Sequence, residues 1–271
     1  MVNTKDAQAL GFDLVVALIT SIFFTFVVCV LLALVATTSL HEFWFQVRSP
    51  QVFSTVWISL QTSLAVVFLA FFLGFPIAYL LALKDFKGKV LLDTLLDLPI
   101  VMPPLVSGLA LLILLSGEGL VGGWLNRWHI DLIFTKKGIV LAQLFVAAPF
   151  FIKTVRESIA AIPKNLLAAS ATLNASSMFT LVHLIFPLCK KGIWTGLVMT
   201  WARALGEFGA TSMVAGCIPQ QTETMTVSIY MQAMSGGLET ATAIALILMV
   251  FSFVFLLIVK TRFGQKDEYP A

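Results

Sequence analysis

Long apolar runs separated by short polar segments dominate the pattern of this chain. Six of these runs approach or exceed the roughly 20 residues that a helix needs to cross a bilayer. They cover residues 12–36, 56–83, 98–115, 138–152, 192–215 and 239–259. The runs are continuous and do not alternate with polar positions, so they predict helices and not the strands of a transmembrane barrel. We therefore expect an all-α integral membrane protein with six transmembrane helices in one domain, residues 1–271.

The longest polar interruption runs from residue 156 to residue 191 and is amphipathic. Within it, residues 165–176 predict a short helix with Leu166, Ala169 and Leu173 along one apolar edge. A segment this polar is expected to lie on one side of the membrane. Two interpretations fit the pattern: a helix resting on the membrane surface, or a docking helix presented to a soluble partner.

Prolines interrupt the apolar runs at two places. Pro76 lies inside the second run and predicts a kink, because it removes one backbone hydrogen bond. The third run begins with Pro99, Pro103 and Pro104, which predict a broken span instead of a regular helix. Irregular backbone at membrane depth is expected only where protein or a water-filled cavity covers it.

Composition and charge add an orientation to this picture. Hydrophobic residues make up 59% of the chain and charged residues 11%, and the mean hydropathy is +0.98. Six spans place both termini on one side, and 12 of the 17 Lys and Arg residues fall on that side, together with the 156–191 stretch. Four fall on the other side, and Arg203 lies within a span. By the positive-inside rule, the termini and the stretch are cytoplasmic.

The fifth run contains charges at membrane depth. Four of its small residues are expected to let another helix approach closely: Ala202, Gly206, Gly209 and Ala210. Beside them Arg203, Glu207 and Thr211 recur at every fourth position and predict a polar stripe that faces inward. The stripe is either a structural ion pair that neutralises itself, or part of a polar pathway in which Arg203 meets a passing anion.

An enzymatic function is disfavoured. The three histidines are isolated, and the sequence contains no zinc-protease, nucleophile-elbow or P-loop motif. Three widely separated cysteines match no metal-ligand spacing, so we expect no metal site. A membrane-embedded enzyme therefore ranks low, and any ATP that drives transport is expected to bind to another subunit.

Several motifs resemble the permease subunits of type I ABC importers. Ala168-Ala169-Ser170, Asn174 and the later Phe186-Pro187 are similar to the cytoplasmic coupling motif of that family, although its glutamate and its glycine are missing here. The stretches 202–211, 215–216, 222–224 and 98–108 are similar to the signatures of the molybdate, tungstate and sulfate branch. The resemblance covers about residues 55–260.

This resemblance implies a function and a set of partners. It implies a permease for a tetrahedral oxyanion, with molybdate favoured over tungstate and sulfate, in the inner or plasma membrane of a prokaryote. The implied partners are a second copy of the chain, two ABC ATPase subunits that bind ATP and magnesium, and an extracytoplasmic oxyanion-binding protein. The resemblance also implies that Ala168, Ala169, Ser170, Leu173, Asn174 and Pro187 couple the chain to the ATPase.

Driven import is consistent with elementary energetics. Moving a dianion inward against an interior-negative potential costs about 4.6 kcal/mol per 100 mV, so a passive pore would run backwards. The resemblance implies alternating access in a symmetric dimer. The main alternative is a stand-alone secondary anion transporter that uses Arg203 and Glu207 in the membrane. The absence of an inverted repeat argues against it, and we expect neither a cofactor on this chain nor a nucleic-acid partner.

Overall fold

The structure is a computed structural model that describes residues 4–263. All regular elements within this range are helical. In chain order they are α1 Thr4–Thr37, α2 Leu40–Val47, α3 Pro50–Leu83, α4 Lys89–Val101, α5 Pro104–Leu115, α6 Gly122–Asn126, α7 Lys136–Ala160, α8 Lys164–Thr172, α9 Ser177–Thr180, the π-helical turn η1 Leu181–Ile185, α10 Phe186–Leu188, α11 Lys190–Leu205, α12 Gly209–Ala215, α13 Met225–Met234 and α14 Leu238–Phe263.

Four helices of the described range are long and apolar enough to cross a membrane, namely α1, α3, α7 and α14. Two further crossings result when each sharply bent pair of helices counts as one span. α4 and α5 meet at 113°, and the segment Ser177–Leu188 meets α11 at 71°. Counted in this way the chain has six crossings, and the predicted all-helical membrane fold is confirmed.

The packed centre of the molecule is formed by α3, α7 and α11. Phe151 of α7 is fully buried there, between Gly74 of α3 and Gly196 of α11. A Cβ atom on Gly74 would lie 2.9 Å from Cδ1 of this ring, and one on Gly196 would lie 3.1 Å from Cδ2. The two glycines therefore allow both neighbouring helices to approach the phenylalanine closely.

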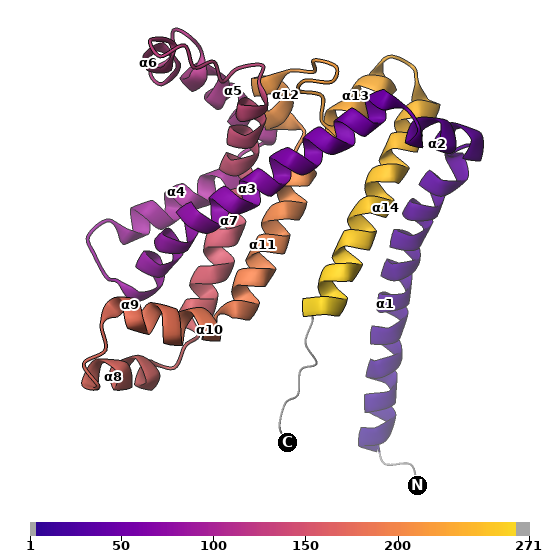
Figure 1. The fold of residues 1–271 in the computed structure, drawn as a ribbon. Helices are drawn as coiled ribbons and strands as arrows, with labels where there is room; N and C mark the ends of the chain where they lie inside the picture. The colour runs from indigo at the N-terminus through magenta and orange to yellow at the C-terminus, as the bar shows by residue number, and fades with distance from the viewer. Residues whose placement is uncertain (1–3, 264–271) are drawn as a thin grey trace.

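The two ends of the bundle carry different elements. Figure 1 shows the first turn of α1, the last turn of α14 and the α8–α10 segment at one end, and α2, α6 and α13 at the other. α1 crosses beside α14, and its membrane-spanning window is 0% buried within this chain. The start of α1, the end of α14 and the α8–α10 segment thus share one end. That this end is cytoplasmic stays a prediction from the charge pattern.

The third span differs from expectation in where it breaks. Pro99 was expected to lie in irregular backbone, but it is inside α4 and is the one buried residue of that helix. Helix geometry stops at Met102 and Pro103, and Pro104 is the first residue of α5. Pro103 and Pro104 therefore carry the break, because a proline disfavours helical backbone in the residue before it and fits well at the first helical position.

The fourth and fifth spans also have different boundaries. The fourth was predicted to end at residue 152, but α7 continues to Ala160 and includes Arg156, the expected first residue of the polar stretch. The fifth was predicted as one helix from 192 to 215. It consists instead of α11 and α12, with residues 206–208 outside helical geometry.

Candidate functional site

Glu207 occupies the break between α11 and α12 and is 1% exposed. Its Oε2 atom lies 2.6 Å from Nη1 of Arg203 on α11. Its Oε1 atom accepts a hydrogen bond of 2.9 Å from the backbone N–H of Ala210, in the first turn of α12. Its carbonyl oxygen accepts a hydrogen bond of 2.9 Å from the hydroxyl of Thr226, which belongs to α13. One residue thus joins three helices and caps an N–H group that the helix start leaves without a partner.

The three members of the predicted polar stripe have different surroundings. Arg203 and Glu207 are brought together, and the side chain of Arg203 keeps 29% exposure while that of Glu207 is enclosed. Thr211 lies beyond the break, where it is fully buried and its hydroxyl has no hydrogen-bond partner among the described residues. Arg203 is therefore the member of the stripe whose side chain stays partly exposed.

The four small residues fall into two pairs. Ala202 and Gly206 are exposed on the surface of this chain, whereas Gly209 and Ala210 are buried. A Cβ atom on Gly209 would lie 2.8 Å from Cβ of Pro104 and 3.0 Å from the backbone nitrogen of Leu105. The breaks of the third and fifth spans therefore touch each other. Gly209 and Ala210 lie against α5, as expected of residues that let another helix approach, whereas Ala202 and Gly206 lie on the other side of the start of α12, because the helix is interrupted at residues 206–208.

The polar segment after α7 forms an exposed helical hairpin. None of the residues of α8 is buried, and Ala168 and Ala169 lie on it. Leu173, directly after α8, is 82% exposed. A groove of about 630 Å³ lies between α8 and the α9–η1 segment, and Ser170, Leu173 and Phe179 contribute to its lining. Apolar and small polar side chains line this groove. The α8–α10 segment that forms it lies at the end of the molecule where α1 begins and α14 ends (Figure 1).

Two residues of the expected coupling motif have unusual backbone surroundings. Asn174 adopts a φ of +53°, a left-handed conformation that asparagine tolerates better than most residues other than glycine. Asparagine therefore provides the backbone conformation that a glycine would favour at this position. Pro187 follows directly on the π-helical turn η1, within α10. A proline removes one helical donor, and a π turn rearranges the hydrogen bonds at this point of the helix.

Comparison with known families covers both of these regions. Residues 73–261 match the family described as the binding-protein-dependent transport system inner membrane component. The chain belongs to this family. It is accordingly a multi-pass protein of the inner membrane, and α5, the α11–α12 break and the α8–α10 hairpin all lie within the matched residues.

Members of the family with curated names are similar over most of the chain. The probable transport system permease protein NifC of Clostridium pasteurianum is 37% identical, over 79% of this chain and 74% of its own length. The molybdenum transport system permease protein ModB of Haemophilus influenzae is 34% identical, over 76% of this chain and 90% of its own length. The sulfate transport system permease protein CysT of Escherichia coli is 30% identical, over 85% and 84%. These relatives agree with the expected molybdate and sulfate branch of the family.

Solved structures support the same fold. A bacterial alginate ABC transporter, in complex with an alginate pentasaccharide-bound periplasmic protein, matches with a TM-score of 0.78 at 17% identity, over 97% of this chain and 98% of that one. The MetNI methionine ABC transporter, in an inward-facing conformation, matches with a TM-score of 0.64 at 17% identity, over 84% and 100%. The fold of this permease chain is therefore the type I importer fold.

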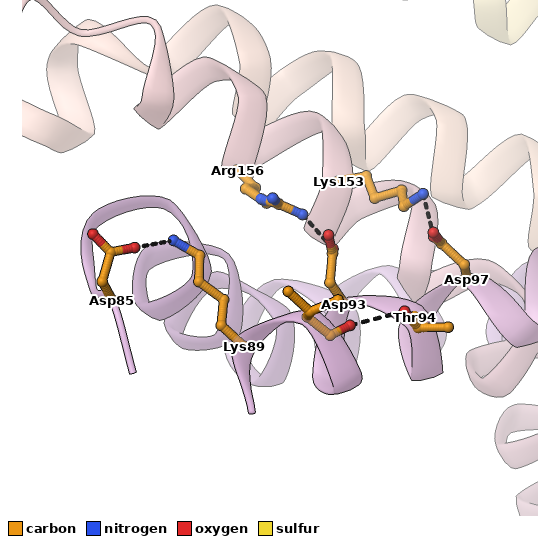
Figure 2. Close-up of polar contacts among 8 residues, drawn as sticks. Asp85, Lys89, Asp93, Thr94, Asp97, Lys153 and Arg156 are labelled. Carbon is orange, nitrogen blue, oxygen red and sulfur yellow. Dashed lines mark hydrogen bonds and ion pairs between the residues drawn. The ribbon is translucent and has the colours of Figure 1, made fainter. Parts of the chain in front are cut away.

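The sequence reasoning missed one polar feature of the permease chain. Asp93 and Asp97 of α4 form ion pairs with Arg156 and Lys153 of α7, respectively (Figure 2). The signal was present as two acidic residues four apart and two basic residues three apart, each set on one helix face. Nothing in the spacing alone indicates that the two helices lie side by side, so the pairing emerges only from the fold.

Proposed function

We propose that this chain is the membrane subunit of an ATP-driven importer of a tetrahedral oxyanion, with molybdate as the preferred substrate and tungstate and sulfate as the nearest alternatives. Relatives named for molybdenum and for sulfate transport support an oxyanion. The partly exposed guanidinium of Arg203, at membrane depth in the fifth span, supports it independently. An intramembrane charge that is not fully enclosed is expensive, and such charges typically serve a substrate or ion pathway.

The observation that carries the proposal is the exposed α8–η1 groove. A helix with no buried residue, followed by a leucine that is 82% exposed, leaves apolar surface that no other part of the described range 4–263 covers. We assign this surface to an ABC ATPase subunit, one for each copy of the chain in a symmetric dimer. Ala169, Ser170 and Leu173 line this groove, and their small and apolar side chains are suited to packing against a helix of the ATPase.

The proposed cycle is alternating access. An extracytoplasmic binding protein delivers the anion at the α2, α6 and α13 end of the dimer. ATP binding draws the two ATPase subunits together and moves the α8 helices, and the two bundles rock between outward-open and inward-open states. ATP and magnesium belong to the ATPase in this scheme, and the permease chain supplies the passage.

The first experiment is a pull-down of the tagged chain from detergent-solubilised native membranes, performed in parallel with Leu173→Asp and Leu173→Met variants. Because Leu173 is exposed, both variants should insert and fold normally. We expect an ABC ATPase to accompany the native chain and the Leu173→Met variant, and to be lost from Leu173→Asp. Absence of any ATPase from the intact native dimer would overturn the proposal and favour a stand-alone transporter.

The choice of anion is tested by competition. In proteoliposomes that contain the complete assembly, uptake of radiolabelled molybdate should be inhibited by tungstate at low concentration and by sulfate only at higher concentration. Equal or stronger inhibition by sulfate would assign the chain to sulfate transport. Uptake without ATP, or without the binding protein, would contradict the driven mechanism.

A further inference from the structure

The lateral helix α4 is held against α7 by two ion pairs. Arg156 contacts Asp93, and Lys153 contacts Asp97, as Figure 2 shows. The acidic residues are one helical turn apart on α4, and the basic residues are one turn apart on α7 in the opposite order. Both pairs can therefore form together in only one register of the two antiparallel helices.

Few other contacts hold α4, and one of them is the packing of Leu96 against the central hydrophobic cluster. α7 is its main neighbour among the described elements, and Pro99 is its one buried residue. Its remaining faces carry exposed apolar side chains, including Val90, Leu91 and Val101. The position of α4 relative to the bundle therefore depends on the packing of Leu96 together with the two ion pairs with α7.

This position connects two regions that are distant in the sequence. At its C-terminal end α7 leads through residues 161–163 directly into α8, on which the ATPase is proposed to act. The C-terminal end of α4 leads through residues 102–103 into α5, whose first turn touches the start of α12 beside Glu207. A displacement of α8 that moves α7 reaches the break directly, because α7 also packs on α12. The ion pairs add a second route, through α4 and its bend into α5.

We infer that the pairs Asp93–Arg156 and Asp97–Lys153 form a strut that stays closed through the transport cycle and carries motion from α8 to the α4–α5 bend. The inference rests on the proposed function and adds four positioning residues to it. The strut does not contact the anion; it makes α4 and α7 move as one body. Its loss should uncouple ATP hydrolysis from transport while leaving the ATPase bound.

A charge-swap cycle tests the strut. Asp97→Lys and Lys153→Asp should each lower ATP-driven molybdate uptake by about tenfold, whereas the double variant should recover most of it, because the pair is restored with reversed polarity. ATP hydrolysis by the assembly should continue in all three variants. Asp85→Asn is the control, since Asp85 forms its ion pair with Lys89, four residues further on, is 98% exposed and lies outside the α4–α7 contact. Single variants with normal uptake, or a double variant no better than either single, would overturn the inference.

Cross-linking distinguishes a strut from a gate that must open. In a chain whose Cys29, Cys189 and Cys217 are replaced by alanine, Asp97→Cys and Lys153→Cys are joined by a short reducible bis-thiosulfonate linker. Uptake should persist while the linker joins α4 and α7, because the linker takes the place of the lost ion pair, and it should fall about tenfold after reduction. Uptake that is blocked by the linker and restored by reductant would show that the helices separate, and would overturn the strut. Failure of the native chain to retain an ATPase would be failure of the proposed function instead.

Discussion

At the scale of single residues, Arg203 and Glu207 can be separated into a structural and a transport role. Glu207→Gln keeps an oxygen acceptor for the N–H of Ala210 but leaves Arg203 without its counter-ion. Breaking a buried pair in this way should cost about 3 kcal/mol, near the lower end of the usual range because Arg203 is partly exposed. Denaturation in mixed detergent micelles measures this loss directly.

The double variant Arg203→Gln with Glu207→Gln provides the matched control. It removes both charges together, which is often nearly neutral for stability, so the folded bundle should regain most of the lost free energy. If Arg203 meets the anion, molybdate uptake should be absent in this variant although the variant is stable. Normal uptake in the double variant would show that the pair is structural only.

Asn174 allows a second test at the same scale. Its φ of +53° is available to glycine at no cost, whereas a β-branched residue pays about 1–2 kcal/mol for a left-handed conformation. Asn174→Gly should therefore keep the α8–α9 turn and retain the ATPase in a pull-down. Asn174→Val should retain less of the ATPase than the native chain does. Equal retention by the two variants would show that the turn geometry does not matter for docking.

At the scale of elements, the close contact of α5 with α12 depends on glycine. A Cβ atom on Gly108 would lie 2.8 Å from the Cα of Ala210 and 2.7 Å from Cβ of Met213. Because backbone cannot move aside as a flexible side chain can, Gly108→Ala should force the helices apart and cost about 1–3 kcal/mol. Gly206→Ala is the control: its Cβ atom would meet only the carbonyl of Ala202 at 3.4 Å, and its thermal midpoint in detergent should match that of the native chain. A Gly108→Ala midpoint equal to the native one would contradict the tight contact.

The sequence predicted the existence of the elements better than their limits. Apolar runs long enough to cross a bilayer identify the spans regardless of their packing. The end of α7 was placed too early because Lys153 and Arg156 resemble a departure from the membrane. Both are neutralised by acidic residues of α4, a contact between distant segments that allows the helix to continue. The break at residues 206–208 could not be predicted in this way, because the sequence has no proline there. It depends instead on the hydrogen bond by which Glu207 caps the start of α12.

At the scale of the whole molecule, the arrangement of the spans could not be derived from the pattern. Periodicity identifies an apolar helix but does not say which face meets which neighbour in a bilayer, where every face is apolar. α1 illustrates this, since its spanning window is entirely unburied within the chain. The candidate residues Arg203 and Glu207 could be identified from the sequence because a charge at membrane depth is rare. The hydrogen bonds that connect Glu207 to α12 and α13 could be identified only from the structure.

For the whole assembly, we predict that molybdate accumulates against an interior-negative membrane potential only when ATP is hydrolysed. Molybdate carries two negative charges, so an interior-negative potential of 100 mV opposes its entry by about 4.6 kcal/mol. At equilibrium a passive pore would exclude the anion from the interior roughly a thousandfold or more. Proteoliposomes with a potassium diffusion potential and ATP available to the ATPase should nevertheless accumulate molybdate above the outside concentration. Replacing ATP by a non-hydrolysable analogue should abolish accumulation at every potential. Distribution that follows the imposed potential, with or without ATP, would show that the chain conducts the anion passively and has no driven cycle.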